Sequence, residues 1–233
     1  MNVKRLWLFT SVGLAAMYGC GTGGSVSSES AKTGAAAPVT IDSLTMERPK
    51  EWEVGDNATY KWVLNNKAQQ LDEELTAITD TELQFVQKVG GRTYEGALER
   101  STLALLKVMC LDNGQQCTFA PALPFWAFPL QLGKTWTATF TAKGDTFTSQ
   151  VTQERRIDKI EKVKVPAGEF QAYKISFKGS YRSTENKGGV YTGKFDGADW
   201  VALVNGKANV VKVEFRSTSG DLGTRELTAV NYK

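Results

Sequence analysis

The sequence predicts an all-β protein of curved antiparallel sheets, arranged as an open barrel or a clam-like pair. Three observations support this fold class. Short runs of alternating apolar and polar residues recur at intervals of roughly 8–12 residues, glycine and asparagine turn signals separate them, and the runs are rich in strand-forming threonine, valine and aromatic residues. The chain has 233 residues, of which 41% are apolar, and this is enough to enclose one core.

Residues 1–19 have the features of a secretory signal. Met1–Arg5 is basic, and Leu6–Met17 is an apolar run of 12 residues with small residues around its end. The run is too short to span a bilayer as a mature helix. Its junction with Cys20 resembles a bacterial lipoprotein signal, in which the cysteine becomes the first mature residue and is acylated. We therefore expect a lipoprotein signal peptide over 1–19 and a lipid anchor at Cys20.

The assignment of Cys20 has an alternative, because Met17 stands where leucine is usual and Tyr18 where a small residue is preferred. In that alternative, the signal is cleaved elsewhere and Cys20 is a free thiol. The other two cysteines can pair with each other, and acylation accounts for the odd cysteine that is left in an exported protein. Gly21, in place of an aspartate, implies by family analogy transport to the outer membrane. The expected location is therefore the bacterial cell envelope, with a lipid anchor in the outer membrane.

The segment 20–48 is expected to be a flexible tether. Glycine, serine and alanine dominate it as far as Pro38, and it has almost no large apolar residues with which to form a core. The folded part is then a single β domain over 49–233.

Strands are expected from the turn signal at Gly55-Asp56 onwards. The segment 71–80 is ambiguous, because its apolar residues fit both a helical period and the two-residue period of a strand. We favour a strand there. The strands expected in the first half are 57–64, 71–80, 83–89, 93–98, 103–111 and 116–119.

Cys110 and Cys117 flank Asn113-Gly114, which is the strongest short signal for a hairpin turn. A two-residue turn centred there places the cysteines opposite each other, with Cα atoms about 5.5 Å apart, within the range that a disulfide tolerates. Export permits the bond. A redox pair is the alternative, but the spacing is not C-x-x-C and the chain has no histidine to activate a thiol. We therefore predict a structural disulfide.

The segment 121–132, PALPFWAFPLQL, carries three prolines, which exclude a helix or a central strand. We expect an extended connector packed over a sheet. The alternative is that its large apolar residues form the lip of a ligand or partner site. The candidate ligand-binding residues are Trp62, Phe125, Trp126, Phe128 and Trp200, although residues of these types more often belong to a core.

The second half is centred on Val163–Phe170, VKVPAGEF. Alternation before Pro166 indicates a half-buried strand, and Ala167-Gly168 can make a tight turn into the next strand. The polar segment 179–189 is expected to be a loop, and Asn205-Gly206 a second hairpin turn. The strands expected in this half are 135–142, 146–154, 157–165, 169–177, 190–195, 199–204, 208–216 and 224–232.

A weak internal repeat relates Gly55–Trp62 to Gly133–Phe140. Each segment begins at a glycine turn and continues into a strand rich in threonine and aromatic residues. One interpretation is a duplication into similar halves, 49–120 and 129–233. The other is that any meander with strands of similar length has this rhythm.

Four segments of the second half resemble a family of bacterial exported β-rich proteins of uncharacterised function. They are Pro129-Leu130 with Gly133 and Trp136, the V-x-V-P-A-G-x-F-x-A-x-K motif at 163–174, Asp199-Trp200, and Glu226-Leu227. The family has one residue between the Asp and the Trp, whereas they are adjacent here. The resemblance covers about 100 residues. It implies a curved antiparallel sheet, open or clam-like, in the cell envelope, and it carries no catalytic residues.

Composition excludes several mechanisms. The chain has no histidine, which excludes catalytic triads and dyads that need an imidazole base and metal sites that contain histidine. Loss of Lys4 and Arg5 with the signal lowers the net charge from +3 to +1 (28 − 2 − 25), which gives no support for nucleic-acid binding. Asp196–Asp199 lacks the further oxygen ligands of a calcium loop. We assign no catalytic residue, metal or cofactor.

The leading hypothesis is a non-enzymatic lipoprotein of the cell envelope that binds an apolar or amphiphilic ligand, or a partner protein, in a concave β surface. The expected partners are the membrane, through the anchor, and a lipid or an envelope protein. The alternative is a structural or assembly component without a small ligand, whose sheet edge recruits another envelope protein. A hydrolase that uses carboxylates is the least favoured hypothesis, because acid pairs cannot be recognised from sequence spacing and nothing in this sequence favours them.

Overall fold

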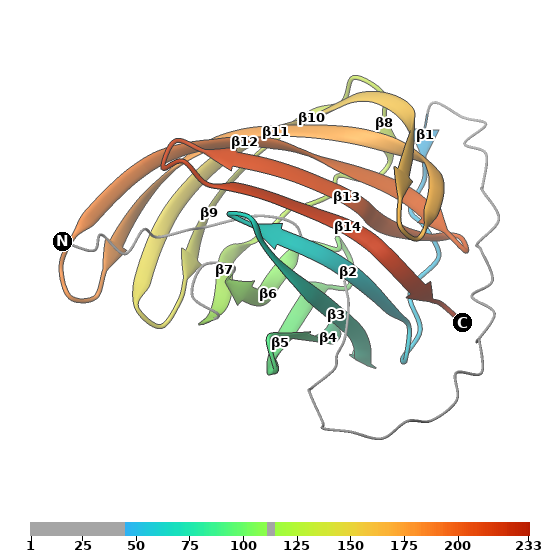
Figure 1. The fold of residues 1–233 in the computed structure, drawn as a ribbon, viewed down its shortest axis with the longest axis horizontal. Helices are drawn as coiled ribbons and strands as arrows, with labels where there is room; N and C mark the ends of the chain where they lie inside the picture. Colours follow the sequence, from blue (N-terminus) through green and yellow to red (C-terminus); the bar gives the residue numbers. More distant parts are fainter. Residues whose placement is uncertain (1–44, 111–114) are drawn as a thin grey trace.

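The computed structural model describes residues 45–110 and 115–233. The regular secondary structure of these residues consists of β-strands alone (Figure 1). Twelve strands form one closed antiparallel barrel, and two short strands form a separate sheet. The all-β prediction is confirmed, with the barrel closed. The strands are β1 (Thr45–Met46), β2 (Asn57–Leu64), β3 (Lys67–Ile78), β4 (Glu82–Val89), β5 (Arg92–Glu99), β6 (Leu105–Cys110), β7 (Gln115–Leu123), β8 (Leu130–Gln131), β9 (Thr135–Lys143), β10 (Phe147–Val165), β11 (Gly168–Glu185), β12 (Val190–Val204), β13 (Lys207–Ser217) and β14 (Leu222–Asn231).

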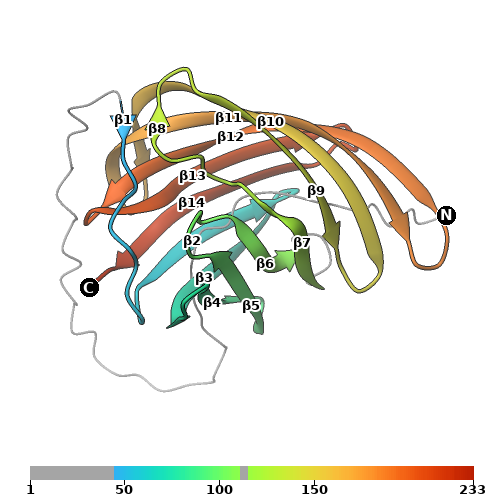
Figure 2. The ribbon, with the colours of Figure 1, turned by 180° about the vertical axis from the view of Figure 1, so that it is seen from behind.

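The barrel is a meander that closes on itself. Neighbouring strands pair in chain order from β2 to β7 and from β9 to β14, while β14 pairs with β2 and β7 with β9. The strands β10, β11 and β12 are 19, 18 and 15 residues long. With β13, they arch over the shorter strands β3 to β7, as both views show (Figures 1 and 2).

The short strands β1 and β8 lie side by side at one end of the barrel (Figures 1 and 2). Thr45 pairs with Gln131, and Met46 with Leu130. The folded part therefore includes residues ahead of the expected start at 49. The signal peptide over 1–19, Cys20 and the tether as far as residue 44 lie outside the described residues.

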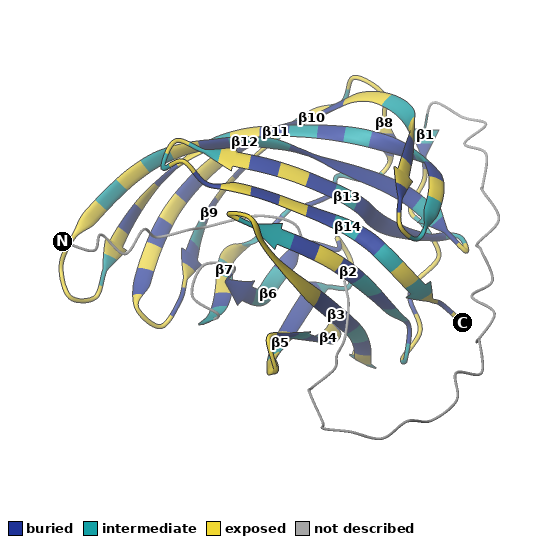
Figure 3. Cartoon of the chain, in the orientation of Figure 1, coloured by how far each residue is buried: buried dark blue, intermediate teal, exposed yellow. Residues whose placement is uncertain are grey.

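Side chains alternate between the barrel interior and its outer face along the long strands, which gives the dark and light bands of Figure 3. In β10, Gln153 and Arg155 are buried, whereas Thr152, Glu154 and Arg156 are exposed. The apolar residues of the inner face form one continuous core. Each large apolar side chain that is fully buried there contributes about 1.5–3 kcal/mol to stability.

Two expected strand breaks were wrong. The segments 146–154 and 157–165 form the single strand β10, because the extra residue Asp158 makes a β-bulge that bends the strand without ending it. Likewise, 190–195 and 199–204 both belong to β12.

The expected loop over 179–189 was also wrong, because β11 continues through Gly179 to Glu185. A Cβ atom at Gly179 would lie 2.4 Å from Cζ of Phe195, its cross-strand neighbour. The Phe195 ring therefore occupies the space of the missing side chain, and it stabilises a strand that glycine alone would weaken.

The VKVPAGEF segment forms the expected hairpin between β10 and β11. Val165 pairs with Gly168, whose φ is 140°, so Pro166-Ala167 is a two-residue turn. The Ala167 N–H donates a hydrogen bond of 3.0 Å to the carbonyl of Leu227 in β14. The hairpin tip is thereby fixed to another part of the barrel.

The connector 121–132 contains strand residues that we did not expect. The strand β7 runs through Pro121 to Leu123, and Leu130–Gln131 form β8. Pro121 is tolerated because β7 pairs with β9 only as far as Ala120, so the missing amide donor has no ladder partner on that side.

The Cys110–Cys117 disulfide is present, with Cα atoms 5.4 Å apart. Its predicted register was wrong, because Cys110 pairs with Gln115, and Cys117 with Val108. The cysteines are diagonal neighbours on one face of the ladder, where side chains still reach each other. Four residues, rather than a two-residue turn, connect β6 to β7, and they lie outside the described residues.

Candidate functional site

Four of the five candidate ligand-binding residues belong to the core. Trp62, Phe125, Trp126 and Trp200 are between 3% and 7% exposed, and Phe128 is half-buried. Trp62, Phe125 and Trp126 fill space inside the protein, and Trp200 is covered by charged side chains, so none of the four faces a ligand in solvent. Trp62 lies on β2 and Trp200 on β12, apart from the three residues of the connector.

The three connector aromatics lie together with Trp52, which precedes β2. The ring of Trp126 makes edge contacts with Phe125 and Phe128, with centroids 5.8 Å apart in each case, and it stacks on Trp52 at 6.0 Å. The expectation that the connector packs over a sheet is met, because Phe125 also contacts Arg155 of β10.

Arg155 and Asp199 form a completely buried ion pair between β10 and β12. The guanidinium lies 4.4 Å from the centroid of the Phe125 ring and 5.2 Å from that of Phe177. Burial raises the pKa of the Asp199 carboxyl, and the positive charges of Arg155 and Arg225 oppose this rise. A carboxylate that is bound by a guanidinium inside the core has a structural role and is poorly placed to act as a base.

Trp200 is buried beneath the charged side chains of the outer face. Its Nε1–H donates a hydrogen bond of 2.8 Å to Glu161, and the ammonium groups of Lys174 and Lys212 each lie 5.0 Å from its ring centroid. Hydrogen bonds from Lys159 and then Trp200 lower the pKa of Glu161. These cations are engaged with the ring, which explains why Trp200 is not free to line a ligand site.

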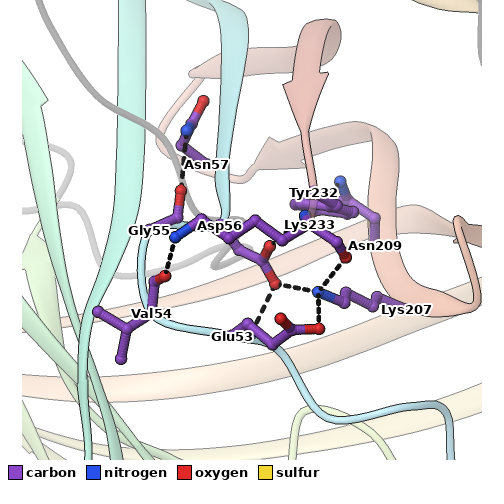
Figure 4. Close-up of polar contacts among 9 residues, drawn as sticks. All are labelled: Glu53, Val54, Gly55, Asp56, Asn57, Lys207, Asn209, Tyr232 and Lys233. Carbon is purple, nitrogen blue, oxygen red and sulfur yellow. Dashed lines mark hydrogen bonds and ion pairs between the residues drawn. The ribbon is translucent and has the colours of Figure 1, made fainter.

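A polar network around Asp56 connects the segment before β2 to β13 and to Lys233, which lies beyond the end of β14 (Figure 4). The Asp56 carboxylate accepts hydrogen bonds from the Glu53 N–H at 2.7 Å, the Lys207 Nζ at 2.5 Å and the Lys233 N–H at 2.8 Å. Lys207 also donates to the Lys233 carbonyl at 3.1 Å. The sequence marks Gly55-Asp56 only as a turn, so this ion pair was not predicted.

Asn209 bridges two buried tyrosines beside this network. The Tyr60 hydroxyl donates to Oδ1 of Asn209 at 2.7 Å, and Nδ2 of Asn209 donates to the Tyr232 hydroxyl at 2.6 Å. Burial is the main cause that raises the pKa of both tyrosines. The network consists of neutral or paired groups that support the barrel.

No group of three or more His, Cys, Asp or Glu side chains that could hold a metal ion occurs in 45–110 and 115–233. Asp196 binds Arg216 on the outer face, whereas Asp199 binds Arg155 inside. The two carboxylates thus do not converge on one point.

The residues that the structure describes contain no helix with the length and hydropathy of a membrane span.

The outer face of β9 to β12 carries two adjoining grooves. The first, here called the cationic groove, has a volume of about 900 Å³. Threonine and serine are the commonest residues of its lining, which also contains two cations and no carboxylate. Its lining is Ala120, Pro121, Thr139, Phe140, Thr141, Gln150, Val151, Thr152, Ser180, Tyr181, Arg182, Thr192, Gly193, Lys194 and Thr218.

Arg182 and Lys194 are exposed, and neither forms an ion pair with another described residue. In the ladder, Arg182 lies opposite Thr192, and Lys194 lies opposite Ser180. Each cation therefore has a hydroxyl as its cross-strand neighbour. This leaves its positive charge without compensation from the strand beside it.

The second groove, here called the paired-charge groove, has a volume of about 800 Å³ and lies over the same strands. Lys178 binds Glu154 at 2.9 Å, and Arg156 lies 3.5 Å from Asp158. Asp196, which also lines this groove, is bound by Arg216 at 2.8 Å. The two grooves thus differ in charge balance, although they belong to one sheet face.

No family model matches the sequence, and no curated protein matches it. Among solved structures, a candidate lipoprotein from Parabacteroides distasonis is similar over 80% of this chain and 99% of its own, with 12% identity and a TM-score of 0.48. A candidate exported protein with a YmcC-like fold from Bacteroides fragilis is similar over 80% and 99%, with 13% identity and a TM-score of 0.41. The hypothetical lipoprotein YmcC from Escherichia coli is similar over 78% and 91%, with 11% identity and a TM-score of 0.41. With identities and TM-scores this low, these likenesses support no functional conclusion.

Proposed function

We propose that this chain is a lipid-anchored, non-enzymatic protein of the bacterial cell envelope that binds a ligand or partner on the outer face of β9 to β12. The observation that carries the proposal is the cationic groove, in which Arg182 and Lys194 are exposed and unpaired among the described residues. The signal-like segment and Cys20 support the envelope location and the anchor.

Burial of the aromatic residues favours a polar ligand over an apolar one. Trp62, Phe125, Trp126 and Trp200 would have to leave the core to contact a lipid chain.

The carboxylates give little support for hydrolysis. Burial raises the pKa of Asp199 and of Asp72, but Asp199 is bound by Arg155, and Asp72 accepts hydrogen bonds of 2.6 and 2.7 Å from Gln70. Neither is part of an open acid pair.

Site-specific photo-crosslinking in living cells tests the binding surface. A photoreactive amino acid in place of Thr152, an exposed residue that lines the cationic groove, is expected to give a covalent adduct with an envelope component. The same amino acid in place of Lys61, an exposed residue of β2 far around the barrel, is the matched control. Adducts from both positions alike, or from neither, would contradict the proposal.

Fractionation of the same cells tests the anchor. The wild-type protein is expected in the membrane fraction and labelled by a fatty acid, whereas Cys20→Ser is expected in the soluble fraction without label. Retention and labelling of the Cys20→Ser protein would show that Cys20 is not the anchor.

A further inference from the structure

The cationic groove has a chemical composition that restricts its ligand. Its charged side chains are Arg182 and Lys194, and its remaining polar side chains are almost all hydroxyls. A hydroxyl both donates and accepts hydrogen bonds, whereas the two cations only donate. The groove therefore fits a ligand that is itself rich in hydroxyls and carries negative charge.

The groove is wide enough to hold a short extended chain. Most of its lining comes from four neighbouring strands, β9, β10, β11 and β12, and the rest is Ala120 and Pro121 of β7 and Thr218, which follows β13. Strands in a sheet lie roughly 4.8 Å apart, so four of them span about 14 Å. Because Arg182 and Lys194 are diagonal neighbours across β11 and β12, their Cα atoms lie roughly 7–8 Å apart. Two acidic groups along one extended ligand could occupy both cations.

From these features, we infer that the cationic groove binds an acidic glycan, a chain of sugars that carry carboxylates. This inference rests on the proposed function of the same face and names its ligand class. Sugar hydroxyls pair with the side chains of residues such as Thr192 and Ser180, and sugar carboxylates pair with Lys194 and with the two-pronged guanidinium of Arg182.

A phosphate polymer or a lipid head group would use the groove less completely. Phosphate oxygens would accept hydrogen bonds from the threonine and serine hydroxyls, but a phosphate polymer has few donors of its own, so the hydroxyl oxygens of the groove would accept hydrogen bonds only from water. A neutral glycan would satisfy these hydroxyls but leave both cations unused. The acidic glycan is the ligand that uses both features.

Binding of the full chain, held in a non-ionic detergent, to short polygalacturonate chains tests the inference by titration calorimetry. Dextran of similar length serves as the neutral glycan, and inorganic polyphosphate as the hydroxyl-poor anion. Polygalacturonate is expected to bind more tightly than either, with an affinity that falls as salt rises. Equal or tighter binding of polyphosphate or dextran, or absence of polygalacturonate binding, would overturn the inference.

Matched double variants separate the groove from general charge. Arg182→Gln with Lys194→Gln removes the two cations of the cationic groove and is expected to weaken polygalacturonate binding about fivefold or more. Lys178→Gln with Arg216→Gln removes two cations of the same sheet face that are already paired with Glu154 and Asp196, and it is expected to change binding less than twofold. Equal losses in both double variants would indicate non-specific attraction and contradict the site.

The crosslinking and titration results have separate meanings. Adducts from position 152 together with no polygalacturonate binding would overturn the acidic glycan and leave the proposed binding surface in place. Absence of adducts would contradict that surface itself.

Discussion

The two faces of the β9 to β12 sheet hold their charges in opposite ways. On the inner face, Arg155 and Asp199 are completely buried and exist as a pair. On the outer face, Arg182 and Lys194 are exposed and unpaired among the described residues. A buried charge needs a partner because water cannot solvate it, whereas an exposed charge does not. The inner charges therefore support the fold, and the outer ones are free to bind a ligand.

Breaking the inner pair is expected to have the largest effect. Arg155→Met leaves the Asp199 carboxylate buried without its guanidinium, which is expected to lower the free energy of unfolding by about 3–5 kcal/mol. Urea unfolding, followed by circular dichroism, measures this loss. Combining Arg155→Met with Asp199→Leu is expected to recover part of it, because the buried carboxylate is then removed together with the guanidinium that binds it.

Arg156→Met is the control for this comparison. Arg156 is the next residue along β10 and is exposed on the outer face, where it lies 3.5 Å from Asp158. Its loss is expected to cost less than about 1 kcal/mol. A similar cost for Arg155→Met and Arg156→Met would show that the two faces do not differ as described.

A smaller effect is expected from the buried tyrosine Tyr232 at alkaline pH. Burial, assisted by the charges of Glu73 and Asp56, raises the pKa of its hydroxyl above the value of an unfolded tyrosine. The folded protein then holds this proton more tightly than the unfolded chain does. The resulting stability is fully present below about pH 10 and falls as pH rises further, by about 1.4 kcal/mol per pH unit.

Tyr232→Phe tests this linkage, because phenylalanine has no proton to lose. Urea unfolding between about pH 10 and pH 11.5 is expected to show a shallower fall in the variant than in the wild type, by about 1.4 kcal/mol per pH unit. Removing the hydroxyl also breaks the bond to Asn209, so the difference in slope, and not the difference at neutral pH, is the relevant quantity. Parallel slopes would contradict the linkage.

Local chemistry made much of the fold predictable. The Asn205-Gly206 turn is present as expected, with φ values of 53° and 81° that suit asparagine and glycine. The Cys110–Cys117 bond was also predictable, because the two cysteines lie close together in sequence. Alternation identified most strands for the same local reason.

Long-range contacts account for the errors. The sequence around Gly179 suggests a loop, whereas pairing with β10 and β12 makes this residue part of β11, and the Phe195 ring of β12 fills the space of its missing side chain. The pairing of β1 with β8 brings Thr45 next to Gln131, which is far away in sequence, so no short sequence pattern indicates it. The duplication into halves 49–120 and 129–233 and the acylation of Cys20 stay predictions.

The candidate site was not predictable for a related reason. In the sequence, Arg182 and Lys194 look like Lys178 and Arg216, since all four alternate with apolar or small residues along a strand. What distinguishes them is the residue opposite each one in the ladder. Lys178 lies opposite Asp196, whereas Arg182 lies opposite Thr192. Strand register sets these partners, and a single sequence does not specify it.

If the two cations of the cationic groove serve the proposed binding, they contribute little to the fold. Urea unfolding of the Arg182→Gln, Lys194→Gln double variant measures that contribution. The free energy of unfolding is expected to stay within about 0.5 kcal/mol of the wild-type value, since both side chains are exposed and unpaired among the described residues. A loss of about 2 kcal/mol or more would show that these cations stabilise the barrel. It would contradict the conclusion that the charges of the inner face support the fold while those of the outer face do not.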